Sequence, residues 1–141
     1  MAVLLDTTCF IALERQKLPL SALGAALADR AVAVSAVTAS ELLVGVHMAD
    51  SQSRRARRSA FVEALLESLP IMPFDLQCAR IHAQLRAQLR ADGVQVGAHD
   101  LLIAATALAH GLSVCTDNVR DFNRIPGLGV VMPQWDAESS R

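Results

Sequence analysis

The sequence is poor in aromatic residues, lysine and cysteine, and it has no long apolar run. Of its 141 residues, four are phenylalanine, one is tryptophan and none is tyrosine. With so few aromatic rings, stacking on nucleic-acid bases is not an obvious source of affinity. Charged residues interrupt every apolar stretch before it reaches the roughly 20 residues that a membrane-spanning helix needs. The N-terminus lacks the basic region of a signal peptide, so we expect a cytoplasmic protein.

The three cysteines, Cys9, Cys78 and Cys115, lie far apart in the sequence and form no CxxC pair. This spacing indicates neither a disulfide framework nor a zinc site. We expect each thiol to be packed as a small apolar side chain in a reducing compartment.

Charge says little about partners, because acidic and basic side chains nearly cancel. Thirteen residues are lysine or arginine and 14 are aspartate or glutamate, which gives a net charge of −1. All the basic residues except Lys17 are arginine, the better phosphate ligand of the two. The run "RRARR" at 54–58 is typical of a solvated helix face, and contact with nucleic-acid phosphates is the alternative.

Apolar patterning predicts one domain, residues 1–135, followed by a disordered tail at 136–141. Short all-apolar runs such as "AVLL" are typical of strands buried on both faces. Strands alternate with helices, which indicates an α/β fold: a three-layer α/β/α sandwich around a mostly parallel sheet. Asp75 is a suitable cap and Gly93 a suitable stop for the helix between them. We predict strands at 2–5, 31–35, 70–74 (an edge, because of its prolines), 112–116 and 128–133, and helices at 7–15, 20–29, 37–48, 50–69, 75–93 and 98–110.

Five acidic residues stand at unusual places. Asp6 directly follows the first strand, and Asp117 directly follows the strand at 112–116, with Asp121 one short turn later. In open parallel sheets, ligands bind outside the carboxyl ends of the strands, so these carboxylates can meet in one crevice. Glu41 and Asp100 lie near the starts of two apolar helices, where a charge is costly unless it is paired or bound to a metal.

Each acid also has a structural explanation. Asp6 can cap the next helix, Glu41 can form a capping box with Thr38, and Asp100 can interact with a helix dipole. Asp117 and Asp121 lie in a turn-like loop, where aspartate is common. These explanations account for each acid separately but do not predict the ordered set. Converging carboxylates repel one another and favour a hard cation such as Mg²⁺ or Mn²⁺, which is the chemistry of metal-dependent nucleases.

Three segments resemble a known family: "VLLDTT" near the start, "SAVTASELLVGV" at 35–46, and "VGAHDLLIAATALAHGLSVCTDNVRDFNRIPGL" at 96–128. The chain resembles PIN domains, and specifically VapC-type toxins of bacterial and archaeal toxin–antitoxin pairs. The resemblance implies an endoribonuclease that cleaves RNA, often transfer or ribosomal RNA, with Mg²⁺ or Mn²⁺ at an acidic quartet. It also implies a homodimer and a small antitoxin protein lying in a groove, for which the helix at 51–69 is a candidate wall.

Carried over by motif, the catalytic acids are Asp6, Glu41 and Asp100, with Asp117 and Asp121 both candidates for the fourth position. Asp6, Asp100 and Asp117 are then the expected metal ligands. The resemblance further implies that Thr7, Thr116 and Asn118 orient ligands or water. Arg120 and Arg124, beside the acidic loop, are candidates for binding RNA. His99 is interpreted as a partly exposed helix residue, with proton transfer as the alternative.

Other phosphate-handling folds fit less well. A HAD-type phosphotransfer domain needs an aspartate two residues after Asp6, where this chain has Thr8, and a receiver domain needs a lysine after a late strand, whereas the only lysine is Lys17. The main alternative is a PIN-like module that binds RNA or protein without cleaving RNA.

Overall fold

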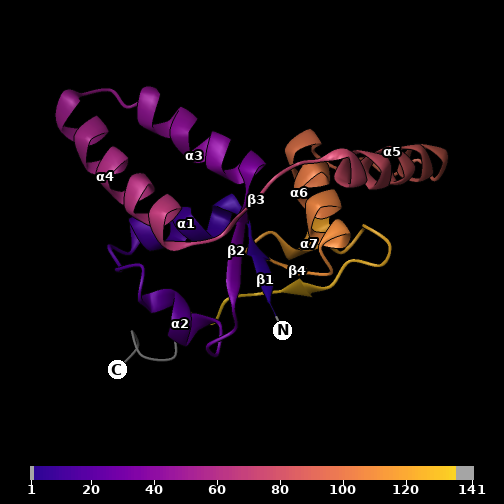
Figure 1. The fold of residues 1–141 in the computed structure, drawn as a ribbon, viewed down its shortest axis with the longest axis horizontal. Coiled ribbons are helices and arrows are strands. Elements are labelled where there is room, and N and C mark those ends of the chain that lie inside the picture. The colour runs from indigo at the N-terminus through magenta and orange to yellow at the C-terminus, as the bar shows by residue number, and fades with distance from the viewer. Residues whose placement is uncertain (1, 136–141) are drawn as a thin grey trace.

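The computed structural model describes residues 2–135, in which helices surround a five-stranded parallel sheet (Figure 1). The predicted tail at 136–141 lies outside the described residues. The sheet has the order β3-β2-β1-β4-β5, and every neighbouring pair is parallel. The strands are β1 (Val3–Leu5), β2 (Val32–Ser35), β3 (Ile71–Met72), β4 (Ser113–Cys115) and β5 (Val130–Val131).

Seven helices are found in the described part of the chain, and none is both long and apolar enough to cross a membrane. The helix expected at 20–29 is shorter, because left-handed backbone at Ala28 (φ 51°) and Asp29 (φ 58°) follows it. A short helix also forms where we expected only a loop. The helices are α1 (Thr7–Arg15), α2 (Ala22–Ala26), α3 (Ala36–His47), α4 (Gln52–Ser68), α5 (Leu76–Ala91), α6 (Ala98–Ala109) and α7 (Val119–Phe122).

Both faces of the sheet are buried, which confirms the three-layer prediction. Successive side chains of a strand point to opposite faces. Leu4 packs into an apolar cluster formed mainly with α5, α6 and α7, whereas Val3 and Leu5 pack into a second cluster formed mainly with α1, α2 and α4. The predicted edge position of residues 70–74 is also correct. Only Ile71 and Met72 pair, because the prolines on either side of β3 cannot donate a backbone hydrogen bond.

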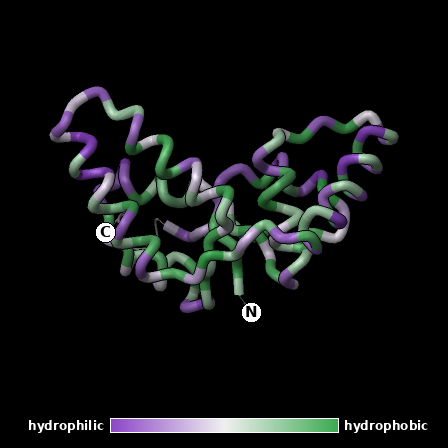
Figure 2. The backbone as a smooth tube through the Cα atoms, turned by 45° about the horizontal axis from the view of Figure 1, so that its top comes forward, coloured by the Kyte–Doolittle hydropathy of each residue, from purple (hydrophilic) through white to green (hydrophobic). Residues whose placement is uncertain are grey.

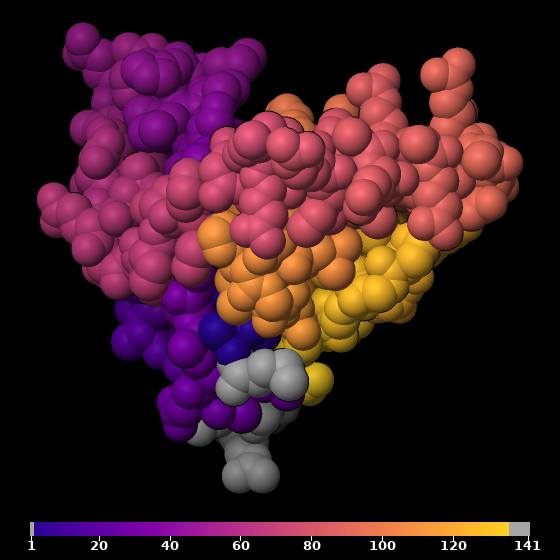
Figure 3. All heavy atoms as spheres, turned by 45° about the vertical axis from the view of Figure 1, so that its right-hand side comes forward, coloured from indigo at the N-terminus to yellow at the C-terminus, as the bar shows by residue number. Residues whose placement is uncertain are grey.

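The α3–α4 pair and α5 extend away from the sheet in different directions (Figure 1). The tip of the α3–α4 arm is hydrophilic (Figure 2), and α6 lies beneath α5 (Figure 3). As predicted, Asp75 caps α5, because its Oδ1 accepts a hydrogen bond from the Cys78 amide at 3.1 Å. Gly93 (φ 69°) ends that helix in a left-handed turn, with the Val94 amide bonded to the Leu89 carbonyl.

The strand order places one switch point between β1 and β4. From β1 the chain builds β2 and β3 on one side, then crosses back to place β4 on the other side. The loops after β1 and β4 therefore leave in different directions and create a crevice at the carboxyl ends of these strands. This crevice is the place where the sequence-predicted acids are expected to meet.

The packing of α5 on α6 can be tested with two leucines of α5. Leu85 is 7% exposed in the cluster shared with α6, whereas Leu76 is 66% exposed. Leu85→Ala should lower the free energy of unfolding by about 2–5 kcal/mol, because it leaves a cavity. The matched surface variant, Leu76→Ala, should change it by no more than about 0.5 kcal/mol. Urea unfolding followed by circular dichroism measures both, and equal effects would contradict this packing.

Candidate active site

Asp6 is a buried carboxylate held by two threonines. It follows β1, is 4% exposed, and its Oδ2 accepts hydrogen bonds from the hydroxyls of Thr8 (3.0 Å) and Thr116 (2.9 Å). Although Asp6 occupies the N-cap position of α1, its side chain makes no capping hydrogen bond. The capping explanation for this acid is therefore wrong, since its side chain faces the crevice between β1 and β4.

The same two hydroxyls connect the loops after β1 and β4. The Asp117 amide donates to the Thr8 hydroxyl at 3.1 Å, and the Asn118 amide donates to the Thr116 hydroxyl at 2.9 Å. Thr8 was not among the residues predicted for the site, although "DTT" offers two neighbouring threonines. Thr7 was predicted, but its hydroxyl is buried and has no hydrogen-bond partner among the described residues. The second threonine, Thr8, thus contacts Asp6, whereas Thr7 lines a groove that also includes Glu41.

Asp100, in the first turn of α6, lies among other acids. Burial raises the pKa of its carboxyl to about 6, and the carboxylates of Asp6, Asp121 and Glu41 add to this effect, while His99 opposes it. Burial is the largest cause, and the smaller contributions of the three carboxylates come from like charges close by. The structure therefore brings together acids from the end of β1 and from α3, α6 and α7.

Glu41 extends from α3 toward this group and does not form the capping box. Ser35 caps α3 instead, because its hydroxyl accepts from the Thr38 amide at 3.0 Å. The Glu41 Oε1 atom is buried and accepts no hydrogen bond from the described residues, although it lies 3.2 Å from Nδ1 of His99. The His99 side chain is 62% exposed, as expected for a residue at the start of a helix.

Asp117 and Asp121 occupy different positions. Asp121 lies on α7, accepts a hydrogen bond from the Asn118 side chain at 2.9 Å, and contributes to the raised pKa of Asp100. Asp117 is an exposed residue; partial desolvation of its carboxyl raises its pKa, and the Asp6 carboxylate adds to this. Of the two, Asp121 is thus the neighbour of Asp100. The short helix α7 turns it toward the group.

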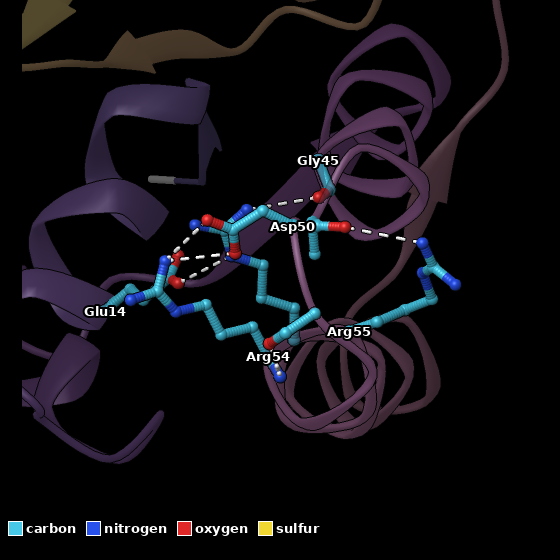
Figure 4. Close-up of polar contacts among 8 residues, drawn as sticks. Glu14, Gly45, Asp50, Arg54 and Arg55 are labelled. Atoms are coloured by element: carbon cyan, nitrogen blue, oxygen red, sulfur yellow. Dashed lines mark hydrogen bonds and ion pairs between the residues drawn. The ribbon is translucent and has the colours of Figure 1, made fainter.

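The arginine run is largely used within the protein (Figure 4). Arg54 pairs with Asp50 at 3.0 Å. Arg58 pairs with Glu14 of α1 at 3.1 Å and donates to the Gly45 carbonyl of α3. These contacts join α4 to its neighbours, which supports the structural interpretation of "RRARR". By contrast, Arg120 and Arg124 are exposed beside the acidic loop, where Arg124 donates to the Gln95 carbonyl.

The donor atoms of the acidic group suit a hard divalent cation. All are carboxylate oxygens, and Mg²⁺ and Mn²⁺ prefer such ligands together with water. The Glu41 Oε1 atom, buried without a hydrogen-bond donor, is the kind of group that a cation or its water shell satisfies. Within the described chain, no three of these acids have ligand atoms all within 4.8 Å of one another.

The raised pKa of Asp100 predicts a pH-dependent stability in the presence of a chelator. An unfolded aspartate has a pKa of about 3.9, so between that value and about 6 the folded chain keeps a proton that the unfolded chain has lost. The stability contributed by this group is full below about pH 4 and is lost as the pH rises through about 6. Asp100→Asn should remove this loss and, allowing for solvent screening, stabilise the protein at neutral pH by about 1 kcal/mol.

Urea unfolding in EDTA at acidic and neutral pH measures this difference. Asp92→Asn, at the exposed C-cap of α5, is the matched control and should follow the wild type. If Asp100→Asn is no more stable than the wild type at neutral pH, the acids are not clustered in solution.

Comparison with known proteins identifies the family. The model of the PIN domain matches residues 3–128. The ribonuclease VapC1 of Rickettsia felis is 37% identical over 134 residues, which covers 93% of this chain and 96% of that protein. The tRNA(fMet)-specific endonuclease VapC of Salmonella typhimurium is 37% identical over 97 residues, covering 69% of this chain and 71% of that protein.

A solved structure agrees with these matches. The crystal structure of DNA-bound VapBC from Salmonella typhimurium superposes with a TM-score of 0.82 at 31% identity, covering 94% of this chain and 98% of that chain. Because the superposition covers nearly the whole chain, the fold that positions the acids described above is shared with that structure. The chain is a PIN domain and belongs to the VapC ribonuclease family.

Proposed function

We propose that this protein is an endoribonuclease that hydrolyses RNA phosphodiester bonds at the acidic group around Asp6 and Asp100, and that it acts as the toxin of a toxin–antitoxin pair. The observation that carries the proposal is the convergence of three other carboxylates, Asp6, Glu41 and Asp121, near Asp100, whose pKa is raised by burial and further by these neighbours. The family supports it, since the relatives include VapC ribonucleases and VapBC toxin–antitoxin complexes.

A divalent cation, Mg²⁺ or Mn²⁺, would be held by Asp6, Asp100 and an acid of the 117–121 loop. When bound, it neutralises charge on the phosphate and activates water for attack. The chain's own residues set the geometry: Thr8 and Thr116 fix the Asp6 carboxylate, and Asn118 orients Asp121. Glu41, whose buried Oε1 accepts no hydrogen bond from the described residues and has only the His99 ring beside it, would position a water or the cation.

The substrate is RNA, and transfer or ribosomal RNA is the class we expect. A relative is named for cleaving tRNA(fMet). Arg120 and Arg124 are exposed beside the acidic loop, so they are the candidates for contacting RNA phosphates. Their fixed charge next to the acids would reduce the repulsion that the acidic group exerts on a polyanion.

The partner we propose is an antitoxin segment that binds along a groove of about 500 Å³ between α1, α3 and α4. The groove has an apolar floor that includes Phe10 and Phe61, and it reaches Glu41 of the acidic group. A segment lying in it would therefore end at the site of chemistry and block access to it. This role fits the predicted use of the helix at 51–69 as a groove wall. We also expect a homodimer, as the family resemblance implies.

Cleavage should depend on Asp100 and on a divalent cation. Partner-free protein incubated with total RNA should give discrete cuts in Mg²⁺ or Mn²⁺ and none in EDTA. Asp100→Asn should reduce the rate at least about 100-fold, because loss of a metal ligand costs more than loss of a supporting residue, itself worth about 10–100-fold. Asp92→Asn should cut like the wild type. If the protein is folded but does not cut RNA with any of the metals tested, the result would favour the non-catalytic binding module instead.

The two candidates for the fourth acid can be separated by the same assay. Asp121→Asn should reduce cleavage more than Asp117→Asn, because Asp121 is the nearer neighbour of Asp100. We expect about a tenfold or greater difference between the two variants, in the range found for residues that support a metal site. Initial rates at saturating Mg²⁺ and Mn²⁺ measure it. A larger loss in Asp117→Asn would assign the fourth position to that residue.

A further inference from the structure

A second group of metal-binding side chains lies at the other end of α6. Asp75 and Cys78 stand at the start of α5, and His110 stands at the end of α6. One ligand atom from each residue lies within 4.8 Å of the other two. The three residues come from two helices that pack closely along their length, so the fold, and not the sequence spacing, brings them together.

Backbone hydrogen bonds fix two of these residues in place. The Oδ1 atom of Asp75 accepts from the Cys78 amide, which holds the carboxylate over the helix start and leaves its second oxygen available. The His110 amide bonds to the carbonyls of Thr106 and Ala107, so its ring projects from a defined position. A metal site needs this kind of restraint, because it lowers the entropy lost when the ligands are ordered around the ion.

Cys78 is buried and His110 is partly buried, and each has a polar atom without a strong partner. Cys78 is 0% exposed, and its thiol makes a weak hydrogen bond, 3.6 Å long, to the Pro73 carbonyl and contacts the Asp75 carboxylate, the neighbouring proposed ligand. The Nε2 atom of His110 is buried and has no hydrogen-bond partner among the described residues. A buried ring nitrogen left without a partner is costly, and a bound cation would satisfy it.

We propose that Asp75, Cys78 and His110 bind a zinc-class divalent ion, with water as the fourth ligand. Oxygen, sulfur and nitrogen donors in one tetrahedral set suit Zn²⁺. Bonds of about 2.0–2.3 Å require ligand atoms about 3–4 Å apart, so modest side-chain rotations close the site. On binding, the thiol releases its proton to solvent and exchanges its contact with Pro73 for a bond to the ion.

This site is separate from the acidic one in place and in chemistry. Asp100 and His110 are ten residues apart on α6, which corresponds to about 15 Å along the helix. The acidic group offers only oxygen, whereas this site offers a thiolate and an imidazole. The ion would join the start of α5 to the end of α6, and so restrain the hairpin that presents Asp100. The assignment departs from the sequence-based expectation that all three cysteines are simple apolar side chains.

Cobalt titration tests the proposal, because Co²⁺ bound to a thiolate gives a near-ultraviolet charge-transfer band that carboxylate ligands do not give. Purified full-length protein should develop this band, saturate at one ion per chain, and lose the cobalt when Zn²⁺ is added. Cys78→Ser should abolish the band, and His110→Gln should weaken binding at least about tenfold. The band should persist in Asp100→Asn and in Cys115→Ser, which removes another buried thiol.

Each outcome decides the matter. Absence of the band in the folded wild type, or an unchanged band in Cys78→Ser, overturns the proposal. If Cys78→Ser does not fold, His110→Gln decides alone, because its ring is only partly buried and its replacement is tolerated more easily; unchanged affinity in that variant also overturns the proposal. A band lost in Cys115→Ser but kept in Cys78→Ser would overturn the proposal and assign the ion to Cys9 and Cys115, whose sulfur atoms lie 3.7 Å apart.

Discussion

Repulsion between carboxylates is the constraint on which the rest of this structure depends. Asp6, Glu41, Asp100 and Asp121 come from different elements, and like charges held close together repel one another. The fold resists their separation in two ways. The hydroxyls of Thr8 and Thr116 fix the most buried carboxylate, and the apolar body of α6 anchors the helix that carries Asp100 in the core. The free energy stored in this arrangement is what a divalent cation would release.

The parallel sheet is suited to this task because its strands end together. Two strands that lie side by side deliver Asp6 and Thr116 to one point, although 110 residues separate them in the sequence. The backbone amides of the second loop then bond to the threonines that hold Asp6. A shift of either strand by one residue would turn these side chains to the other face. The register of β1 against β4 therefore sets the position of the Asp6 carboxylate as well as the pairing of the sheet.

Much of this arrangement could be predicted from the sequence. The alternation of apolar runs and helical periods gave the fold class, and acids directly after strands indicated the crevice. Short-range detail was harder to predict. "DTT" does not reveal which threonine faces Asp6, and Thr38 with Glu41 imitates a capping box that Ser35 makes unnecessary. Local patterns describe what a side chain can do, whereas packing between distant segments decides what it does. The grouping of Asp75 and Cys78 with His110 also depends on packing between distant segments, so the sequence alone did not predict it.

Both edges of the sheet are only two residues long. Edge strands expose unpaired backbone groups that can recruit another chain, and short edges beside prolines offer almost no template for this. Contact with a second protein must then be made through side chains on the helices, where shape and charge can distinguish one partner from another. For a protein whose activity has to be restrained by a particular partner, this sheet design favours selective association over aggregation.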